Sequence, residues 1–130
     1  MQNMFKKLLN SKVKWACYLP TLLCLNFAVE AKIYVFVSHS MNDSALQQYY
    51  KEAESLGATL IMRGLIDDSF TKNKEKAELL KIAYDINPEL FDEYQITVVP
   101  AIVKHENNVI QKITGHLPLR EVLKIFEDHE

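Results

Sequence analysis

The segment Ile33–Val37 is an unbroken run of β-branched and aromatic residues, and it narrows the possible folds more than any other stretch. Such a run is typical of a strand buried on both faces of a mainly parallel sheet. Gly57 provides a helix stop, and a second buried strand is predicted at 59–62. Because a helix that joins two such strands makes a right-handed crossover, we expect one β-α-β unit with parallel strands. The residues that form the apolar face of this helix are Leu46, Tyr49, Tyr50 and Ala53.

Two further helices and a short helical turn are predicted downstream. Charged and apolar residues alternate with helical spacing over 70–84, and Ser69 precedes this segment as a possible N-cap. Asn87 and Pro88 predict a short helix, with Asn87 as the cap and Pro88 in the first turn. Apolar residues from Leu119 to Phe126 predict a C-terminal amphipathic helix. The aromatic residues expected to be mainly in the core are Tyr49, Tyr50, Phe70, Phe91 and Tyr94.

A hairpin is predicted between the short helix and the last one. Two apolar strands, 98–103 and 109–114, flank the turn-forming residues Glu106–Asn108, and Gly115 ends the second strand. The strands of such a hairpin are antiparallel. The complete order is therefore β-α-β-α-β-β-α, an α/β domain with a central mixed sheet flanked by helices.

Pro100 lies inside the first strand of this hairpin. A proline removes a hydrogen-bond donor from the sheet, so it is normally found at strand starts or edges. In thioredoxin-like domains a cis-proline begins the corresponding strand and faces the first loop and the start of the first helix. The element order together with Val99–Ala101 predicts a thioredoxin-like fold with a cis peptide bond before Pro100.

The first 31 residues have the pattern of a secretory leader. Lysines precede an apolar stretch from Trp15 to Val29, and Val29–Ala31 supplies the small residues of a cleavage site. The apolar stretch is interrupted by Pro20 and is shorter than the roughly 20 residues of a membrane-spanning helix. We expect a cleaved signal peptide at 1–31 and a single domain at 32–130, with a retained anchor as the less favoured alternative and no membrane span after cleavage.

Both cysteines of the chain, Cys17 and Cys24, fall inside this predicted leader. Residues 32–130 therefore contain no thiol, and thiol–disulfide exchange requires a thiolate as the attacking group. The same residues contain 11 basic and 16 acidic side chains, a net charge of −5. An acidic domain without a basic stripe is a poor candidate for direct binding to nucleic acid. The histidines lack the spacing of a metal site, so neither metal nor cofactor is expected.

At the level of motifs, the chain resembles the TrbC-type pilin assembly proteins of F-type conjugative transfer systems. Two stretches are fairly specific: the loop around Met41 and the turn Met62–Leu65. This sequence has Asn42 where relatives often have proline, and Gln95 where they often have glycine. The stretches that carry the resemblance are Phe36–Leu46, Gly57–Leu65, Asp67–Phe70, Ile86–Phe91 and Tyr94–Ala101.

The resemblance implies a thioredoxin-like protein without the Cys-x-x-Cys motif. It implies a role in assembling the conjugative pilus, in the periplasm, as part of a type IV secretion system. It implies no enzyme activity. Some relatives are fused to a second transfer protein of the TraW type, so a TraW-like protein is the first partner to test, with other pilin assembly components next.

Several residues near the predicted start of the first helix have catalytic and structural interpretations. Ser44 lacks an evident general base, so capping of the helix by Asn42, Asp43 or Ser44 is favoured over nucleophilic catalysis. His39 has few partners for a triad, which favours a structural or recognition role. Arg63 is expected to pair with Asp67, Asp68 or a partner's carboxylate, and Gly64 is expected to adopt a positive φ. No catalytic residue is predicted.

The predicted partner-binding face combines three segments that this fold brings together. Met41 contributes a flexible apolar side chain that can adapt to a partner surface. Two other functions stay open: a periplasmic thiol–disulfide oxidoreductase or isomerase, and a general chaperone-like binding module. The residues predicted for the face are Ser40, Met41, Asn42, Asp43, Ser44, Arg63, Gly64, Val99, Pro100 and Ala101.

Overall fold

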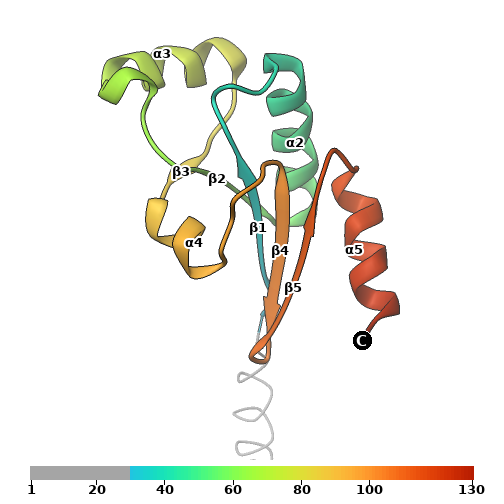
Figure 1. The fold of residues 1–130 in the computed structure, drawn as a ribbon. Helices are drawn as coiled ribbons and strands as arrows, with labels where there is room; N and C mark the ends of the chain where they lie inside the picture. Colours follow the sequence, from blue (N-terminus) through green and yellow to red (C-terminus); the bar gives the residue numbers. More distant parts are fainter. Residues whose placement is uncertain (1–29) are drawn as a thin grey trace, which may run out of the picture. The chain divides into compact units, whose positions relative to one another are not determined.

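The computed structural model describes residues 30–130, which form a five-stranded mixed sheet with helices on both faces (Figure 1). The sheet order is β3-β2-β1-β4-β5, with β1 parallel to β2 and antiparallel to β4. This confirms the predicted α/β architecture. In chain order the elements are β1 (Lys32–Val37), α2 (Asp43–Leu56), β2 (Thr59–Met62), the 3-10 helix η1 (Ile66–Asp68), α3 (Phe70–Leu80), β3 (Asp85–Ile86), α4 (Pro88–Glu93), β4 (Ala101–Glu106), β5 (Val109–Thr114) and α5 (Leu119–Asp128).

The predicted leader lies almost entirely outside the described residues. Within residues 30–130, no helix has both the length and the apolar character that crossing a bilayer requires.

Strand β1 occupies the centre of the sheet, as its composition predicts. It pairs with β2 from Tyr34 to Val37 and with β4 from Lys32 to Phe36. Val35, Phe36 and Val37 are completely buried. Because successive side chains of a strand point to opposite faces, Val35 and Val37 join one hydrophobic cluster and Phe36 joins another.

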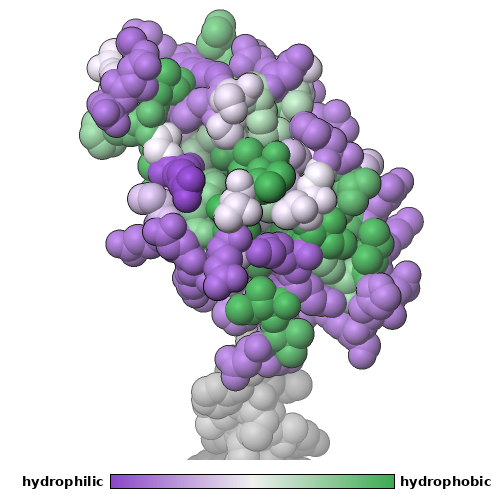
Figure 2. Space-filling model, in the orientation of Figure 1, coloured by the Kyte–Doolittle hydropathy of each residue, from purple (hydrophilic) through white to green (hydrophobic). Residues whose placement is uncertain are grey.

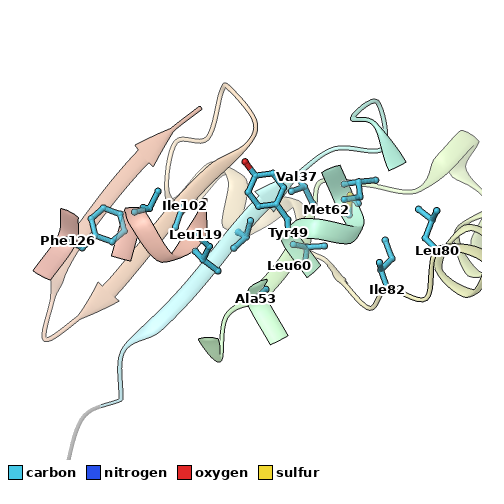
Figure 3. Close-up of a cluster of buried hydrophobic side chains, with 13 residues drawn as sticks. Val37, Tyr49, Ala53, Leu60, Met62, Leu80, Ile82, Ile102, Leu119 and Phe126 are labelled. Carbon is cyan, nitrogen blue, oxygen red and sulfur yellow. The ribbon is translucent and has the colours of Figure 1, made fainter. Parts of the chain in front are cut away.

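The first cluster lies between the sheet and the helices α2 and α5 (Figure 3). Helix α2 contributes Leu46, Tyr49 and Ala53, which confirms the predicted apolar face. Gly57, in the left-handed conformation at φ 70°, ends this helix as predicted. Helix α5 contributes Leu119, Val122 and Phe126 from its own apolar stripe. The two helices therefore cover one face of the sheet with side chains spaced for that purpose.

The second cluster lies on the opposite face, beneath the short helix α4. The ring of Phe36 meets the ring of Phe91 edge-on, with centroids 4.9 Å apart, and lies 6.1 Å from the ring of Tyr94. Asn87 caps α4 by accepting a hydrogen bond from the backbone N–H of Leu90 at 3.2 Å, and Pro88 occupies the first turn. Both capping features follow the prediction.

The predicted helix over 70–84 is too long. Ser69 caps α3 as expected, but the helix ends at Leu80, where Lys81 turns left-handed at φ 54°. Ile82 is buried, and Asp85–Ile86 then forms β3, a two-residue edge strand beside β2. The chain therefore gains a fifth strand that was not predicted.

The aromatic residues are only partly where they were expected. Tyr49, Phe91 and Tyr94 are buried, whereas Tyr50 is half-buried. Phe70 is 78% exposed, so its assignment to the core is wrong. As the first residue of α3, it starts a helix whose buried side chains are those of Asn73 and Leu80.

The hairpin of β4 and β5 forms with a tighter turn than predicted. Asn107 and Asn108 make the turn at φ 50° and 64°, the positive values that a two-residue hairpin turn requires. Strand β4 begins at Ala101 rather than at residue 98, because Val98 to Pro100 form an irregular approach to the sheet. Figure 2 shows hydrophobic surface near the β4–β5 turn, where Val109 and Ile110 are more than half exposed.

Candidate functional site

Three predicted segments meet at one end of the sheet. The loop after β1 and the loop after β2 lie at the same end because these strands are parallel. Ala101 at the start of β4 pairs with Phe36 near the end of β1, so the approach to β4 lies at this end too (Figure 1). We call Ser40–Ser44, Arg63–Gly64 and Val99–Ala101 the candidate face.

Asn42 organises the first loop of the candidate face. Its Oδ1 accepts hydrogen bonds from the Ser44 backbone N–H at 2.9 Å and from the Ser44 hydroxyl at 2.8 Å. Asn42 is therefore the N-cap of α2, and the Ser44 hydroxyl takes part in the cap. This geometry agrees with the capping interpretation, because the Ser44 hydroxyl donates to a neutral amide oxygen and not to a general base.

Replacing Asn42 with alanine should lower the free energy of unfolding by about 1 kcal/mol, the usual effect of losing an N-cap side chain. Urea unfolding followed by circular dichroism would measure the loss. Asn108→Ala would not be a suitable control because Asn108 holds a positive φ. Gln48→Ala is a better one, because Gln48 is an exposed residue in the same helix. Equal stability of Asn42→Ala and Gln48→Ala would contradict the capping role.

His39 connects the β1–α2 loop to the β2 loop and to α3. Its Nε2 lies 3.1 Å from the carbonyl oxygen of Gly64, so the Nε2–H group donates to that oxygen. Its ring also meets the ring of Tyr84 edge-on, with centroids 5.5 Å apart. Within the described part of the chain, Nδ1 is buried without a hydrogen-bond partner. These contacts support a structural role.

Lys76 ties helix α3 to the same loop. Its Nζ donates to the carbonyl oxygen of His39 at 3.2 Å and lies 3.4 Å from a carboxylate oxygen of Asp43. No sequence pattern predicts these contacts of Lys76, because they depend on how α3 folds back over the loop. Lys76 therefore joins His39 to Asp43 of the candidate face in one polar group.

The free energy of unfolding should decrease as the pH is lowered through the range in which His39 titrates. Burial, with a smaller contribution from Lys76, lowers the pKa of His39, and the Gly64 hydrogen bond opposes this only in part. The unfolded chain, with an ordinary pKa of about 6.5, therefore binds a proton at a higher pH than the folded protein does. This contribution of His39 to stability is complete above the pKa of the unfolded chain. It is lost as the pH falls through the lower pKa of the folded protein.

The measurement is urea unfolding at about pH 7.5 and about pH 5.5, a range in which histidine titrates. The wild-type protein should lose stability toward the lower pH, and His39→Gln should lose less. His129→Gln, which changes an exposed histidine, serves as the control. An identical pH dependence in wild type and His39→Gln would refute the assignment.

Arg63 lies at the end of β2, and within the described residues its side chain contacts α4. Its guanidinium lies 3.8 Å from the Asp92 carboxylate and 5.4 Å from the centre of the Phe91 ring, both in α4. Among the described residues Arg63 pairs with neither Asp67 nor Asp68, so that expectation is wrong, and Asp67 pairs with Lys72 at 2.7 Å instead. Pairing with a carboxylate of a partner protein stays a prediction. The side chain of Arg63 is 65% exposed, so its pair with Asp92 contributes less than about 1 kcal/mol. The guanidinium is therefore held near α4 while staying accessible.

Gly64 was expected to hold a positive φ, and this is wrong. The glycines with positive φ among the described residues are Gly57 and Gly115. A Cβ atom added at Gly64 would meet no atom within 4 Å. Gly64 therefore carries no conformational requirement for glycine, and its carbonyl oxygen, bonded to His39, is the part that the site uses.

The two glycines that border β2 on either side make a matched test. Gly57→Ala should lower the free energy of unfolding by roughly 1 kcal/mol, because alanine is strained in the left-handed region. Gly64→Ala should change stability by no more than about 0.5 kcal/mol. Thermal and urea unfolding of both variants would check this. A larger loss at position 64 than at position 57 would contradict the backbone conformations described above.

The third segment of the candidate face lies mostly beneath the surface. The Val99–Pro100 peptide bond is cis, as predicted. Pro100 and Ala101 are fully buried, and the carbonyl oxygen of Pro100 accepts a hydrogen bond from the Gly115 N–H at 2.9 Å. Val99 is half-buried and Val98 is 57% exposed. Pro100 and Ala101 thus shape the surface from below, while Val98 and Val99 reach it.

Comparison with known proteins gives a family match and a set of structural similarities. The family described as "Type-F conjugative transfer system pilin assembly protein" matches residues 35–123. No curated protein matches the chain.

Two solved structures have a similar fold at low sequence identity. StoA from Bacillus subtilis is 15% identical with a TM-score of 0.55, over 73% of this chain and 81% of StoA. MTB dsbF, in its mixed oxidized and reduced forms, is 13% identical with a TM-score of 0.54, over 76% of this chain and 80% of dsbF. Identities this low show the fold alone, and that fold is thioredoxin-like.

Proposed function

The chain belongs to the family of type-F conjugative transfer system pilin assembly proteins, and from this premise we propose that it is a non-catalytic assembly factor that acts in the periplasm by binding another protein of the transfer apparatus. The candidate face is the proposed binding surface. A TraW-like protein is the proposed first partner, because the resemblance described above implies that some relatives are fused to a protein of this type.

The observation that carries the proposal is what stands at the start of α2. A redox-active thioredoxin-like domain places its reactive thiolate at this helix start, where the helix dipole stabilises the negative charge. This chain has Met41–Ser44 there, and residues 32–130 contain no cysteine. The side chains of Asn42 and Ser44 form the hydrogen bonds that cap α2. The helix start at which thiol–disulfide exchange would take place therefore has no thiol, which supports a function in binding.

The exposed part of the candidate face suits protein recognition. Ser40 and Arg63 are exposed, and Met41 is half-buried against the first cluster. Arginine and flexible apolar side chains are enriched in protein interfaces. The hydrogen bond between His39 and Gly64 joins the two loops on which these side chains lie. A pre-organised surface of this kind loses little conformational entropy on binding.

A cysteine-free variant tests the non-catalytic part of the proposal. In a conjugative strain that lacks this gene, the wild-type chain should restore pili and DNA transfer. The variant Cys17→Ser with Cys24→Ser should restore both equally, because neither cysteine belongs to the predicted domain. Pilus counts and transfer frequency are the readouts, with immunoblots to show equal protein levels. Failure of the variant at equal levels would contradict a function without thiols.

A further inference from the structure

A small cavity opens at the β3 edge of the sheet, on the side covered by α2. Its volume is about 270 Å³, and its walls include Tyr50 and Glu54 of α2, Thr59 of β2, and Tyr84 and Asp85. This is smaller than the roughly 300–1,000 Å³ of sites for drug-sized ligands. The cavity is therefore of a size to hold one amino-acid side chain.

The aromatic wall formed by Tyr84 is fixed in place. Its hydroxyl donates toward the backbone oxygen and the Oδ1 of Asn73, each at 3.2 Å. Its ring packs edge-on against His39, and Tyr50 packs against the first hydrophobic cluster. Burial raises the pKa of Tyr84, so its hydroxyl remains a donor at neutral pH. A ligand would find these rings already positioned.

The charged side chains that line the cavity are both acidic. Glu54 and Asp85 are exposed, and within residues 30–130 neither forms an ion pair. No basic side chain is among the described residues that line the cavity. Aromatic rings and carboxylates together favour a cation, because the ring face is electronegative and the carboxylates are unpaired.

The backbone beside the cavity has room for another strand. β3 pairs only with Ile61 and Met62, so the start of β2, at Thr59 and Leu60, has no neighbouring strand on that side among the described residues. Ile86 of β3 is 38% exposed at the same edge. An open sheet edge is a common docking place for an extended segment of a partner.

We propose that this cavity binds a lysine or arginine side chain from an extended segment of a partner protein that lies along the β3 edge. The side chain's cation meets Glu54 and Asp85, and its aliphatic part lies between Tyr50 and Tyr84. The net charge of −5 on residues 32–130 attracts such a segment from a distance. This surface is separate from the candidate face, so the proposal does not depend on how that face is used.

Nuclear magnetic resonance titration with a defined probe tests the proposal. The probe is the peptide acetyl-Thr-Val-Arg-Val-Thr-amide, and its comparison carries citrulline, which has a similar shape without the charge, in place of arginine. The protein is purified after expression of the full chain. The arginine peptide should cause saturable shifts at the amides of Ala58, Thr59 and Asp85. The citrulline peptide should bind at least ~10-fold more weakly, because it lacks the positive charge that the two carboxylates contact.

Matched variants separate the cavity from general acidity. Glu54→Gln with Asp85→Asn should weaken the arginine peptide by at least ~10-fold. The double variant Glu121→Gln with Asp128→Asn also removes one glutamate and one aspartate charge, from exposed positions of α5, and should leave binding unchanged. Equal loss in both double variants, or no saturable shift in the wild type, would overturn the proposal. The proposal would also be overturned if the wild-type protein self-associated and the double variant Glu54→Gln with Asp85→Asn did not. A second copy of the chain would then be the occupant of the cavity.

Discussion

Replacing Phe36 with alanine should lower the free energy of unfolding by about 3–5 kcal/mol, the largest stability effect that we expect from one substitution in this protein. Phe36 is completely buried and lies on the central strand. Its ring contacts Phe91 and Tyr94, so the variant would lose these contacts and leave a cavity under α4. The free energy of unfolding of a whole domain is only about 5–15 kcal/mol, so this loss is a large part of it.

Urea unfolding gives the measurement, with Phe70→Ala as the matched control. Phe70 is 78% exposed, so its replacement should change stability by no more than about 0.5 kcal/mol. Phe36→Leu keeps most of the apolar volume and should lose less than Phe36→Ala, which preserves the test if the alanine variant does not fold. Similar losses for Phe36→Ala and Phe70→Ala would contradict the proposed packing of the second cluster.

The elements with a buried face were predictable from the sequence. Ile33–Val37 is apolar throughout because β1 has a covered face on each side. The apolar stripes of α2 and α5 have helical spacing because each helix packs one side on the sheet. In these places burial imposes a pattern that the residue types reveal.

The second half of the β2–α4 connection was not predictable in the same way. β3 contains two residues, Asp85 and Ile86, and both are exposed, so no alternation of buried and exposed positions marks it. α3 ends where Lys81 becomes left-handed, although no glycine or proline stands there. Tertiary contacts, rather than local preference, decide the structure of this connection.

The candidate face was predictable as a set of loops but not as a set of contacts. Capping by Asn42 follows from residue type, since asparagine is a favoured N-cap. The pairing of Arg63 with Asp92 joins residues from different elements, and the nearer Asp67 was the natural expectation from sequence. The burial of Pro100 also depends on the strands around it. Sequence spacing gives no information on such distant contacts.

The second large effect concerns binding at the candidate face. Arg63→Glu reverses an exposed charge at the end of β2 and should weaken binding to the TraW-like partner by at least ~10-fold, because arginines that become buried in an interface often contribute about 2 kcal/mol or more. The thermal midpoint should change little, since the ion pair with Asp92 is exposed. Ser40→Tyr adds bulk on the neighbouring loop and should weaken binding independently.

Isothermal titration calorimetry of the TraW-like partner with wild-type protein, Arg63→Glu and Arg120→Glu measures whether the partner binds at the candidate face. Arg63 and Arg120 are the two arginines of the chain, and Arg120 is exposed on α5 and is not one of the residues of the candidate face. The two variants therefore carry the same change in charge. We expect Arg120→Glu to bind like wild type and Arg63→Glu to bind at least ~10-fold more weakly. Wild-type affinity in Arg63→Glu, or equal weakening in both variants, would contradict binding through this face.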